Sequence, residues 1–275
     1  MPIIRSISGL RATISDGCLN SELIREYIFA YTNCIQSGQV VIGRDGRPSG
    51  EGIEQEIINI LTRLGLDVVD LGIVPTPTVQ IITQESKASG GIVITASHNP
   101  ADWNGLKFIN QNGIFFDENE NALLWNYLDN RIPPRQHSSK IGQIARLHDA
   151  IDIHINKILD LQIWNHIELS PILAMVDAVN SSGSHAVPKL LERIGCSVDR
   201  LYCDGSGNFP HIPEPVPENL TDLSDAVRKA KSQIGIAVDP DADRLVLIDE
   251  MGNAIGEENT IVLAIWSVLE LSKNP

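Results

Sequence analysis

The sequence predicts an α/β protein made of two successive three-layer α/β/α domains with mixed, mostly parallel sheets. Two observations carry this prediction. Short β-branched apolar runs alternate with longer segments of helical periodicity, which is the pattern of parallel strands joined by crossover helices. A polar, proline-bearing stretch at 131–139 interrupts the alternation and indicates the approach to a linker. We therefore expect domains over residues 1–150 and 151–255, followed by a short segment, 256–275.

The first domain is expected to be a doubly wound unit in which strands alternate with helices. Its apolar patterning predicts a strand over 40–43, a helix over 52–64, a strand over 67–73, a short helix over 76–84 and a strand over 91–95. The Asn112-Gly113 pair then predicts a hairpin between 106–109 and 114–116, and a helix follows over 119–130.

The second domain repeats the alternation. The expected elements are a helix over 147–161, a strand over 172–179, a helix over 185–194, a strand over 197–203, a helix over 220–231 and a strand over 234–239. The four prolines in 210–217 indicate a rigid, exposed connection. A last helical pattern covers 257–271.

Ser97 is a candidate nucleophile, because it lies where an apolar strand ends in a polar turn. The run at 91–94 is β-branched, and Pro100 cannot continue a central strand. The Ser97 hydroxyl is therefore expected at the carboxyl end of a strand, the edge of an open α/β sheet where ligands bind. The alternative is a simple turn over 97–100, whose small polar side chains bond to their own backbone.

Three aspartates, Asp239, Asp241 and Asp243, alternate directly after the apolar run 234–238. Crowded carboxylates repel one another unless a cation compensates them, and an all-oxygen set suits Mg²⁺. An EF-hand calcium loop does not fit, because its sixth position would be Arg244 and the strand-like run that follows would carry its last ligand away. The remaining alternative is a set of aspartates that cap turns and pair with surface lysines.

The composition argues against several partners. The chain of 275 residues is 43% apolar and 20% charged, enough for one large or two medium cores. Its net charge of −14 argues against nucleic acid and against an anionic membrane. Four cysteines without metal-ligand spacing or a dense disulfide framework, and with no apolar leader before them, favour a reduced, cytoplasmic setting.

Four motifs together resemble the α-D-phosphohexomutase family of phosphoglucomutases, phosphomannomutases and phosphoglucosamine mutases. They span nearly the whole chain in the family's order. The motifs are Ser8-Gly9-Leu10-Arg11, the Gly-Arg-Asp-Gly-Arg-Pro-Ser segment at 43–49, the serine turn at 95–100 and the aspartate turn at 239–244. The combination is far more specific than any one motif.

The resemblance implies a mechanism. In the family the serine matching Ser97 carries a phosphoryl group, and the aspartate turn holds Mg²⁺ against it. The implied enzyme interconverts hexose 1-phosphate and hexose 6-phosphate through phosphorylated Ser97, with a hexose 1,6-bisphosphate as intermediate and activator. Its metal ligands are Asp239, Asp241, Asp243 and a phosphoserine oxygen. Its partner is a phosphorylated hexose or hexosamine, and the sequence does not choose among glucose, mannose and glucosamine.

Four further residues receive catalytic roles from the same resemblance. Lys107 matches the family lysine proposed as general base or acid, whereas the sequence alone indicates an exposed strand lysine. His98 is expected to orient the phosphoserine, or else to be a partly exposed turn histidine. Arg11 and Arg244 can bind phosphate oxygens bidentately, as substrate ligands together with Lys107. Arg244 can instead balance the charge of the aspartates, and both roles can coexist.

The segment 256–275 limits the prediction to part of an enzyme. Family members continue with a third domain, whose Gly-Glu-x-Ser-Gly type loop discriminates the sugar, and with a fourth that grips its phosphate, and neither motif occurs here. We therefore expect a truncated beginning of domain III, with domains III and IV otherwise missing and the chain alone inactive.

Two other functions can be compared with this one. A two-domain protein that binds Mg²⁺ and phosphosugar without turnover remains an alternative. A phosphatase of the haloacid dehalogenase type does not fit, because it places its aspartates after its first strand and leaves Ser97 unexplained.

Overall fold

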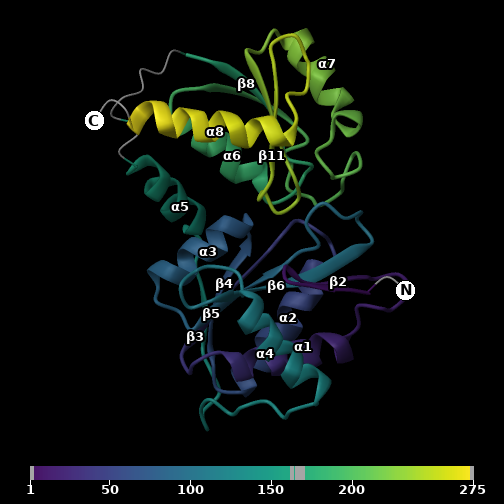
Figure 1. The fold of residues 1–275 in the computed structure, drawn as a ribbon, viewed down its shortest axis with the longest axis vertical. Helices are drawn as coiled ribbons and strands as arrows, with labels where there is room; N and C mark the ends of the chain where they lie inside the picture. Colours follow the sequence, from purple (N-terminus) through teal and green to yellow (C-terminus); the bar gives the residue numbers. More distant parts are fainter. Residues whose placement is uncertain (1–2, 162–163, 165–170, 273–275) are drawn as a thin grey trace.

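The computed structural model describes residues 3–161, 164 and 171–272, which form two α/β/α lobes (Figure 1). Within these residues, one lobe is built on a seven-stranded sheet and the other on a four-stranded sheet. The two predicted three-layer domains with mixed sheets are thereby confirmed. Of the predicted segment 256–275, residues 273–275 lie outside the described part of the chain.

The first sheet is parallel at its centre and antiparallel at one side. Across the sheet, its strands are β1 (Ile3–Ser6), β2 (Gly9–Thr13), β6 (Trp103–Asn110), β5 (Gly90–Ile94), β3 (Gln39–Arg44), β4 (Asp67–Ile73) and β7 (Ile144–Arg146). β3 runs parallel to β4 and β5, whereas β6 runs antiparallel to β5 and β2. β5 ends three residues before Ser97, and on the neighbouring strand β6 Lys107 pairs with Val93 of β5.

Helices cover both faces of this sheet. One buried apolar cluster lies beneath α1 (Ser21–Cys34), α2 (Gly50–Arg63) and α4 (Glu118–Asp129), and a second lies beneath α3 (Thr76–Glu85) and the start of α5 (Ala150–Leu159). Local signals fix two of the helix starts. Asn20 accepts the N–H of Leu23 before α1, and Asp117 and Glu120 form a capping box at α4.

The second sheet has the strand order β11 (Leu245–Ile248), β10 (Ile234–Val238), β8 (Leu173–Asp177) and β9 (Ser197–Leu201). β8 runs parallel to β9 and β10, and β11 closes the sheet antiparallel to β10. α7 (Thr221–Ala230), preceded by the short 3₁₀ helix η2 (Pro217–Asn219), and α6 (Gly183–Arg193) pack on separate apolar clusters of this domain. Both domains thus place a strand end, β5 or β10, directly before a candidate site turn.

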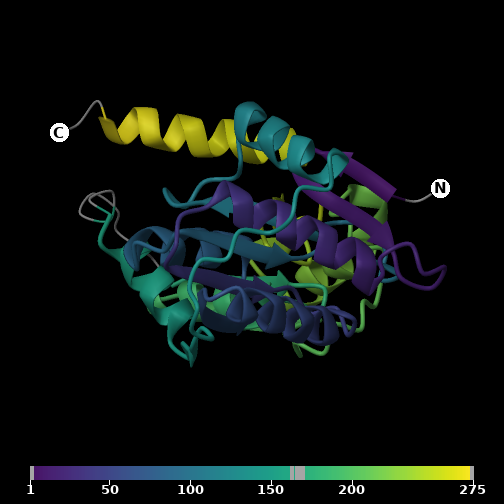
Figure 2. The same ribbon diagram turned by 90° about the horizontal axis from the view of Figure 1, so that it is seen from below.

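The last helix, α8 (Glu257–Ser272), lies on the outside of the molecule (Figure 2). Six of its large apolar side chains are each at least 51% exposed. They are Ile261, Val262, Ile265, Trp266, Val268 and Leu269. No helix within the described ranges is long and apolar enough to cross a membrane.

Several features differ from the sequence-based expectations. β1, β2 and α1, all before residue 39, were not predicted. The expected strand at 114–116 is reduced to one antiparallel bridge between Phe115 and Ile109. The connection at 210–217 is not wholly exposed, because Pro213 and Pro215 are buried. The four cysteines have free thiols.

Candidate active site

Ser97 lies in the turn after β5, in a backbone conformation that needs support. Its φ is +51°, in the left-handed region, and the residue is only 2% exposed. Residues other than glycine adopt this region only where their surroundings hold them there. Its N–H donates to Thr95 Oγ1 at 2.8 Å, and its Oγ donates to Asp239 Oδ2 of the second domain at 2.9 Å. The candidate nucleophile is therefore fixed by both domains.

Arg47 provides most of the support for the serine turn. Its side chain is fully buried, and Nη1 and Nη2 donate to four main-chain carbonyl oxygens over 2.6–2.9 Å. The acceptors are the carbonyl groups of Ser97, Asn99, Pro100 and Trp103. The guanidinium thus replaces the regular hydrogen bonds that this irregular backbone lacks.

Asp45 completes the support beneath the turn. Its Oδ2 accepts the Arg47 Nε–H at 2.9 Å and the Thr95 hydroxyl at 2.7 Å, and Thr95 in turn accepts the N–H of Ser97. Burial raises the pKa of Asp45, against the opposing effect of Arg47. Asp45 is completely buried. Asp45 and Arg47 therefore bond to protein groups instead of water, in a closed hydrogen-bond network around Ser97.

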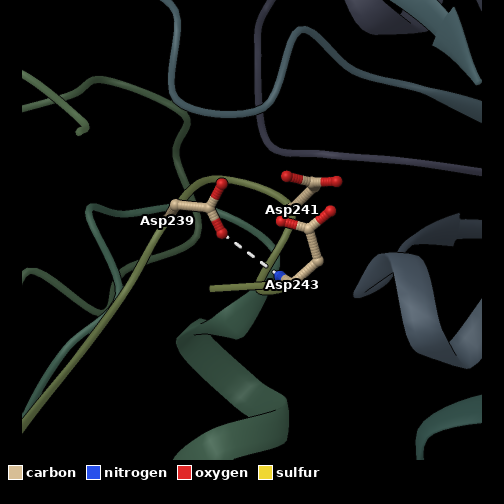
Figure 3. A group of neighbouring side chains, drawn as sticks. All are labelled: Asp239, Asp241 and Asp243. Carbon is tan, nitrogen blue, oxygen red and sulfur yellow. Dashed lines mark hydrogen bonds between the residues drawn. The ribbon is translucent and has the colours of Figure 1, made fainter. Parts of the chain in front are cut away.

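The three aspartates lie on one turn after β10 (Figure 3). Asp239 Oδ1 accepts the N–H groups of Asp243 and Arg244, each at 3.1 Å, and Ala242 takes a left-handed φ of +52°. One oxygen from each of Asp239, Asp241 and Asp243 falls within 4.8 Å of the others. The turn brings these oxygens close enough to share one small cation.

Lys107 reaches the aspartate turn from the first domain. Its Nζ lies 2.6 Å from Asp241 Oδ2 and 2.6 Å from Asp243 Oδ2, and the residue is 4% exposed. The expectation of an exposed strand lysine is therefore wrong. Burial alone would lower the pKa of Lys107, but the two carboxylates outweigh it and the pKa is raised. Lys107 is thus a protonated ammonium group paired with both carboxylates.

The pKa values of two carboxyl groups of the turn shift in opposite directions, and the groups differ in their partners. Burial, and then the charges of Asp241 and Asp243, raise the pKa of Asp239 well above its usual value. Burial opposes ionisation of Asp241 too, but Lys107 lowers the pKa of Asp241 below its usual value. Asp241 Oδ1 is buried without a hydrogen-bond partner. A buried, unpartnered carboxylate oxygen beside two further carboxylates fits a ligand of a divalent cation, and Mg²⁺ prefers such oxygens.

Three basic side chains complete the surroundings of Ser97 to different degrees. His98 Nδ1 lies 3.4 Å from Ser97 Oγ, and burial, followed by the charges of Arg244 and Arg11, lowers the pKa of His98. Arg11 Nη1 donates to Asn99 Oδ1 at 3.1 Å, and its Nε is buried without a partner. The Arg244 side chain instead points to Glu257, 3.7 Å away. Arg11 is thus placed for an anion at the serine turn, and Arg244 lies at its margin.

Sequence reasoning missed the roles of Asp45, Arg47, Thr76 and Thr95. Thr76, at the start of α3, donates its hydroxyl to Asp241 Oδ2 at 2.5 Å and its N–H to the Asp241 carbonyl at 2.8 Å. The available signal was the spacing of Asp45 and Arg47, because an aspartate readily accepts the N–H of the residue two positions later, here at 2.9 Å.

These features define a class of protein: a two-domain α/β protein whose first domain offers a buried serine hydroxyl to an acidic turn of its second. The comparisons with known proteins agree. The chain belongs to the phosphoglucomutase/phosphomannomutase family: its α/β/α domain I matches residues 3–132 and its α/β/α domain II matches residues 152–252.

Individual relatives support the same family. A phosphoglucomutase/phosphomannomutase of Thermococcus kodakarensis is 37% identical over 84% of this chain and 50% of its own length. A probable phosphoglucosamine mutase of Methanopyrus kandleri is 32% identical over 96% of this chain and 57% of its own length. A crystal structure of a family member from Burkholderia thailandensis matches with a TM-score of 0.80 and 28% identity, over 99% of this chain and 60% of that one. The family is one of enzymes, and this chain spans about half the length of the curated relatives it matches.

Proposed function

We propose that this chain is the phosphoryl-transfer part of a phosphohexomutase, with Ser97 as the phosphoryl carrier. The observation that supports this most directly is the buried contact between Ser97 Oγ and Asp239 Oδ2, 2.9 Å apart and contributed by different domains. Membership of a mutase family adds the reaction class. The substrate class is a phosphorylated hexose or hexosamine.

The reaction is a reversible exchange of phosphoryl groups. The bond between phosphorus and Ser97 Oγ breaks while a bond forms to the free hydroxyl oxygen of a hexose 1- or 6-phosphate, and the proton of that hydroxyl ends on Ser97 Oγ. The hexose 1,6-bisphosphate then reorients and returns its other phosphoryl group to Ser97, and the proton returns to the released sugar oxygen. Phosphate is conserved over the cycle, so the bisphosphate serves as intermediate and as activator.

Mg²⁺ is the cofactor that the donor set fits. Asp239, Asp241 and Asp243, together with an oxygen of phosphorylated Ser97, would hold it, and the unpartnered Asp241 Oδ1 supports this assignment. When bound, the ion supplies positive charge against the oxygens of the transferred group.

The remaining polar residues have separate roles toward the substrate. Lys107, a buried ammonium group, donates a proton to the departing oxygen and binds a phosphoryl oxygen. His98, 3.4 Å from Ser97 Oγ, orients the phosphoserine. Arg11 offers its unpartnered Nε–H to a phosphate oxygen. Arg244 binds substrate phosphate from the margin of the aspartate turn and offsets its charge.

The relatives' additional length bears on turnover. Because this chain spans about half of them, we propose that sugar selection needs the equivalents of their domains III and IV. Residues 1–275 by themselves should then accept a phosphoryl group on Ser97 slowly, since they would position the donor incompletely.

The test is transfer of labelled phosphate from a hexose 1,6-bisphosphate to the chain in the presence of Mg²⁺. We expect one phosphate per chain, located on Ser97 by mass spectrometry, and no labelling of Ser97→Ala, whose fold should be unchanged. Ser86→Ala is the matched control, because Ser86 is an exposed serine at the end of α3 whose hydroxyl donates to the Ile82 carbonyl, and it should not affect labelling. Phosphate on another residue would contradict the proposal. Mg²⁺ and phosphosugar binding without labelling would favour the non-catalytic alternative.

A further inference from the structure

A loop of the second domain crosses the first domain at Arg47. The ring of Phe209, in the connection between β9 and η2, lies 4.9 Å from Arg47 Cζ. Two residues earlier the main chains meet: a Cβ atom added to Gly207 would lie 1.7 Å from the carbonyl oxygen of Gly46. The approach of this loop to Arg47 is therefore a close, backbone-level contact that only glycine at 207 permits.

Hydrogen bonds on both sides of Phe209 fix the loop to its own domain. The Gly207 N–H donates to the Asn180 carbonyl at 2.7 Å, and Asn180 Nδ2 donates to the Asn208 carbonyl at 3.1 Å. On the other side, His211 Nε2 lies 3.0 Å from Asp177 Oδ2 at the end of β8. The position of Phe209 is thus set by the second sheet.

The interactions of Arg47 leave only the face of its guanidinium for another partner. Its five N–H groups have five acceptors in the first domain, the Asp45 carboxylate at Nε and the four carbonyls of the serine turn. An aromatic ring over the free face of the cation adds attraction without competing for these donors. Phe209 occupies that face.

The structure assigns Phe209 as a positioning residue for Ser97, in the sense that its ring holds Arg47 against the serine turn. The second domain then acts on the nucleophile in two separate ways, through the aspartates and through this ring. Naming Ser97 as the phosphoryl carrier rests on the proposed function. The packing role itself rests on the contacts alone.

The experiment compares Phe209→Leu, Phe209→Tyr and the unchanged chain. Phe209 is half-buried and borders an open groove of about 440 Å³, so Leu should preserve the fold while it removes the ring. We expect Phe209→Leu to speed amide hydrogen exchange in residues 96–103 and to slow Ser97 labelling by up to about tenfold. The Kd for Mg²⁺, from calorimetry, should stay unchanged. Phe209→Tyr should restore both rates.

Trp125→Leu is the matched control. The Trp125 ring also covers an arginine, with Arg5 Cζ at 4.9 Å, but it lies away from Arg47. It should leave exchange in 96–103 and labelling unchanged. If the Leu variant does not fold, Phe209→Met offers the same comparison without a ring.

Two results would overturn the assignment: unchanged exchange in 96–103 in Phe209→Leu, or faster exchange throughout both domains. If the unchanged chain does not label at Ser97, the proposed function fails, and the exchange measurement still decides the role of Phe209.

Discussion

The serine turn and the aspartate turn are built alike and held differently. Each follows a strand at the centre of a sheet, and each contains one left-handed residue other than glycine, Ser97 and Ala242. The carbonyls of the serine turn are bound by Arg47 of the same domain. The carboxylates of the aspartate turn are bound by Lys107 and Thr76 of the other domain.

The serine turn is preorganised by its own domain, whereas the aspartate turn depends on positive charge from outside its domain. The Asp45 carboxylate balances the charge of the buried Arg47 guanidinium, and four carbonyl oxygens accept its N–H groups. This closed network sets the backbone of Ser97 before any ligand arrives. The three carboxylates repel one another, and positive charge from outside their domain offsets this. Changes at the two turns should therefore have different consequences, for stability in the first and for cation affinity in the second.

The largest effect is expected at the serine turn. Arg47→Met should cost about 3–5 kcal/mol in the free energy of unfolding, because it leaves the buried Asp45 carboxylate without its cation and four carbonyls without donors. Urea denaturation measures the loss. The double variant Asp45→Asn/Arg47→Met should recover part of it, since the unpaired charge is gone. A loss below about 1 kcal/mol would mean that the turn is held by other contacts.

The aspartate turn should respond in affinity. Asp241→Asn should weaken Mg²⁺ binding at least about tenfold, or about 1.4 kcal/mol, because it removes a charged ligand oxygen from the set. Calorimetric titration gives both affinities. Asp249→Asn is the control and should bind Mg²⁺ normally, because Asp249 bonds to Asn253 in a turn at the other end of β11. Equal affinities for all three proteins would refute the metal assignment.

A smaller, pH-dependent effect is expected in the connection between β9 and η2, which carries Phe209 and His211. Both nitrogens of His211 face acceptors, Asp177 Oδ2 at 3.0 Å and the Ile212 carbonyl at 2.8 Å, so the imidazolium fits this site. Burial lowers the pKa of His211, but the hydrogen bond and charge of Asp177 outweigh it and raise the pKa above 6.5. The stabilisation is therefore complete below about pH 6.5 and is lost as pH rises through the folded-state pKa.

We expect thermal unfolding to report this loss as about 1 kcal/mol, or roughly 2–4 °C in Tm. His211→Gln should remove that part of the pH dependence, because glutamine does not titrate. A pH profile that is the same in both proteins would show that His211 is not protonated in the folded state.

The smallest effect is expected far from both turns. Removal of residues 261–275 should change the free energy of unfolding by less than about 0.5 kcal/mol, because the described apolar side chains at 261–269 include six that are at least half exposed. Differential scanning calorimetry measures the change. Leu223→Ala, in the fully buried part of α7, is the reference and should cost about 2–5 kcal/mol. A comparable loss on truncation would place α8 in the core that supports the aspartate turn.

Local patterns predicted much of the framework. β4 spans 67–73 as predicted, and α2 and β5 differ from their predicted ranges by two residues or fewer at each end. These segments have strong periodicity and glycine or proline at their borders, so their identity is decided within a few residues of chain. β1 gave no such signal, because its side chains are largely exposed and only four residues form the strand.

The site was predictable only in part, for a related reason. Ser97 and the aspartates stand at strand ends, a position that sequence can show. The burial of Lys107 depends on Asp241 and Asp243, which are 134 and 136 residues away in the chain. Arg47 likewise depends on carbonyls 50 to 56 residues away. No local pattern encodes such partners, so the support of the site became visible only in the folded chain.

The 2.9 Å contact between Ser97 and Asp239 also constrains how the two domains can evolve. Each domain has its own sheet and its own apolar clusters, so either one could be copied into another gene as a fold. Neither copy would contain the proposed site, because the Ser97 hydroxyl and the acidic turn would be on different chains. Selection on activity therefore acts on the two domains together. It should tolerate substitutions within each hydrophobic core more readily than substitutions at the interface between the domains.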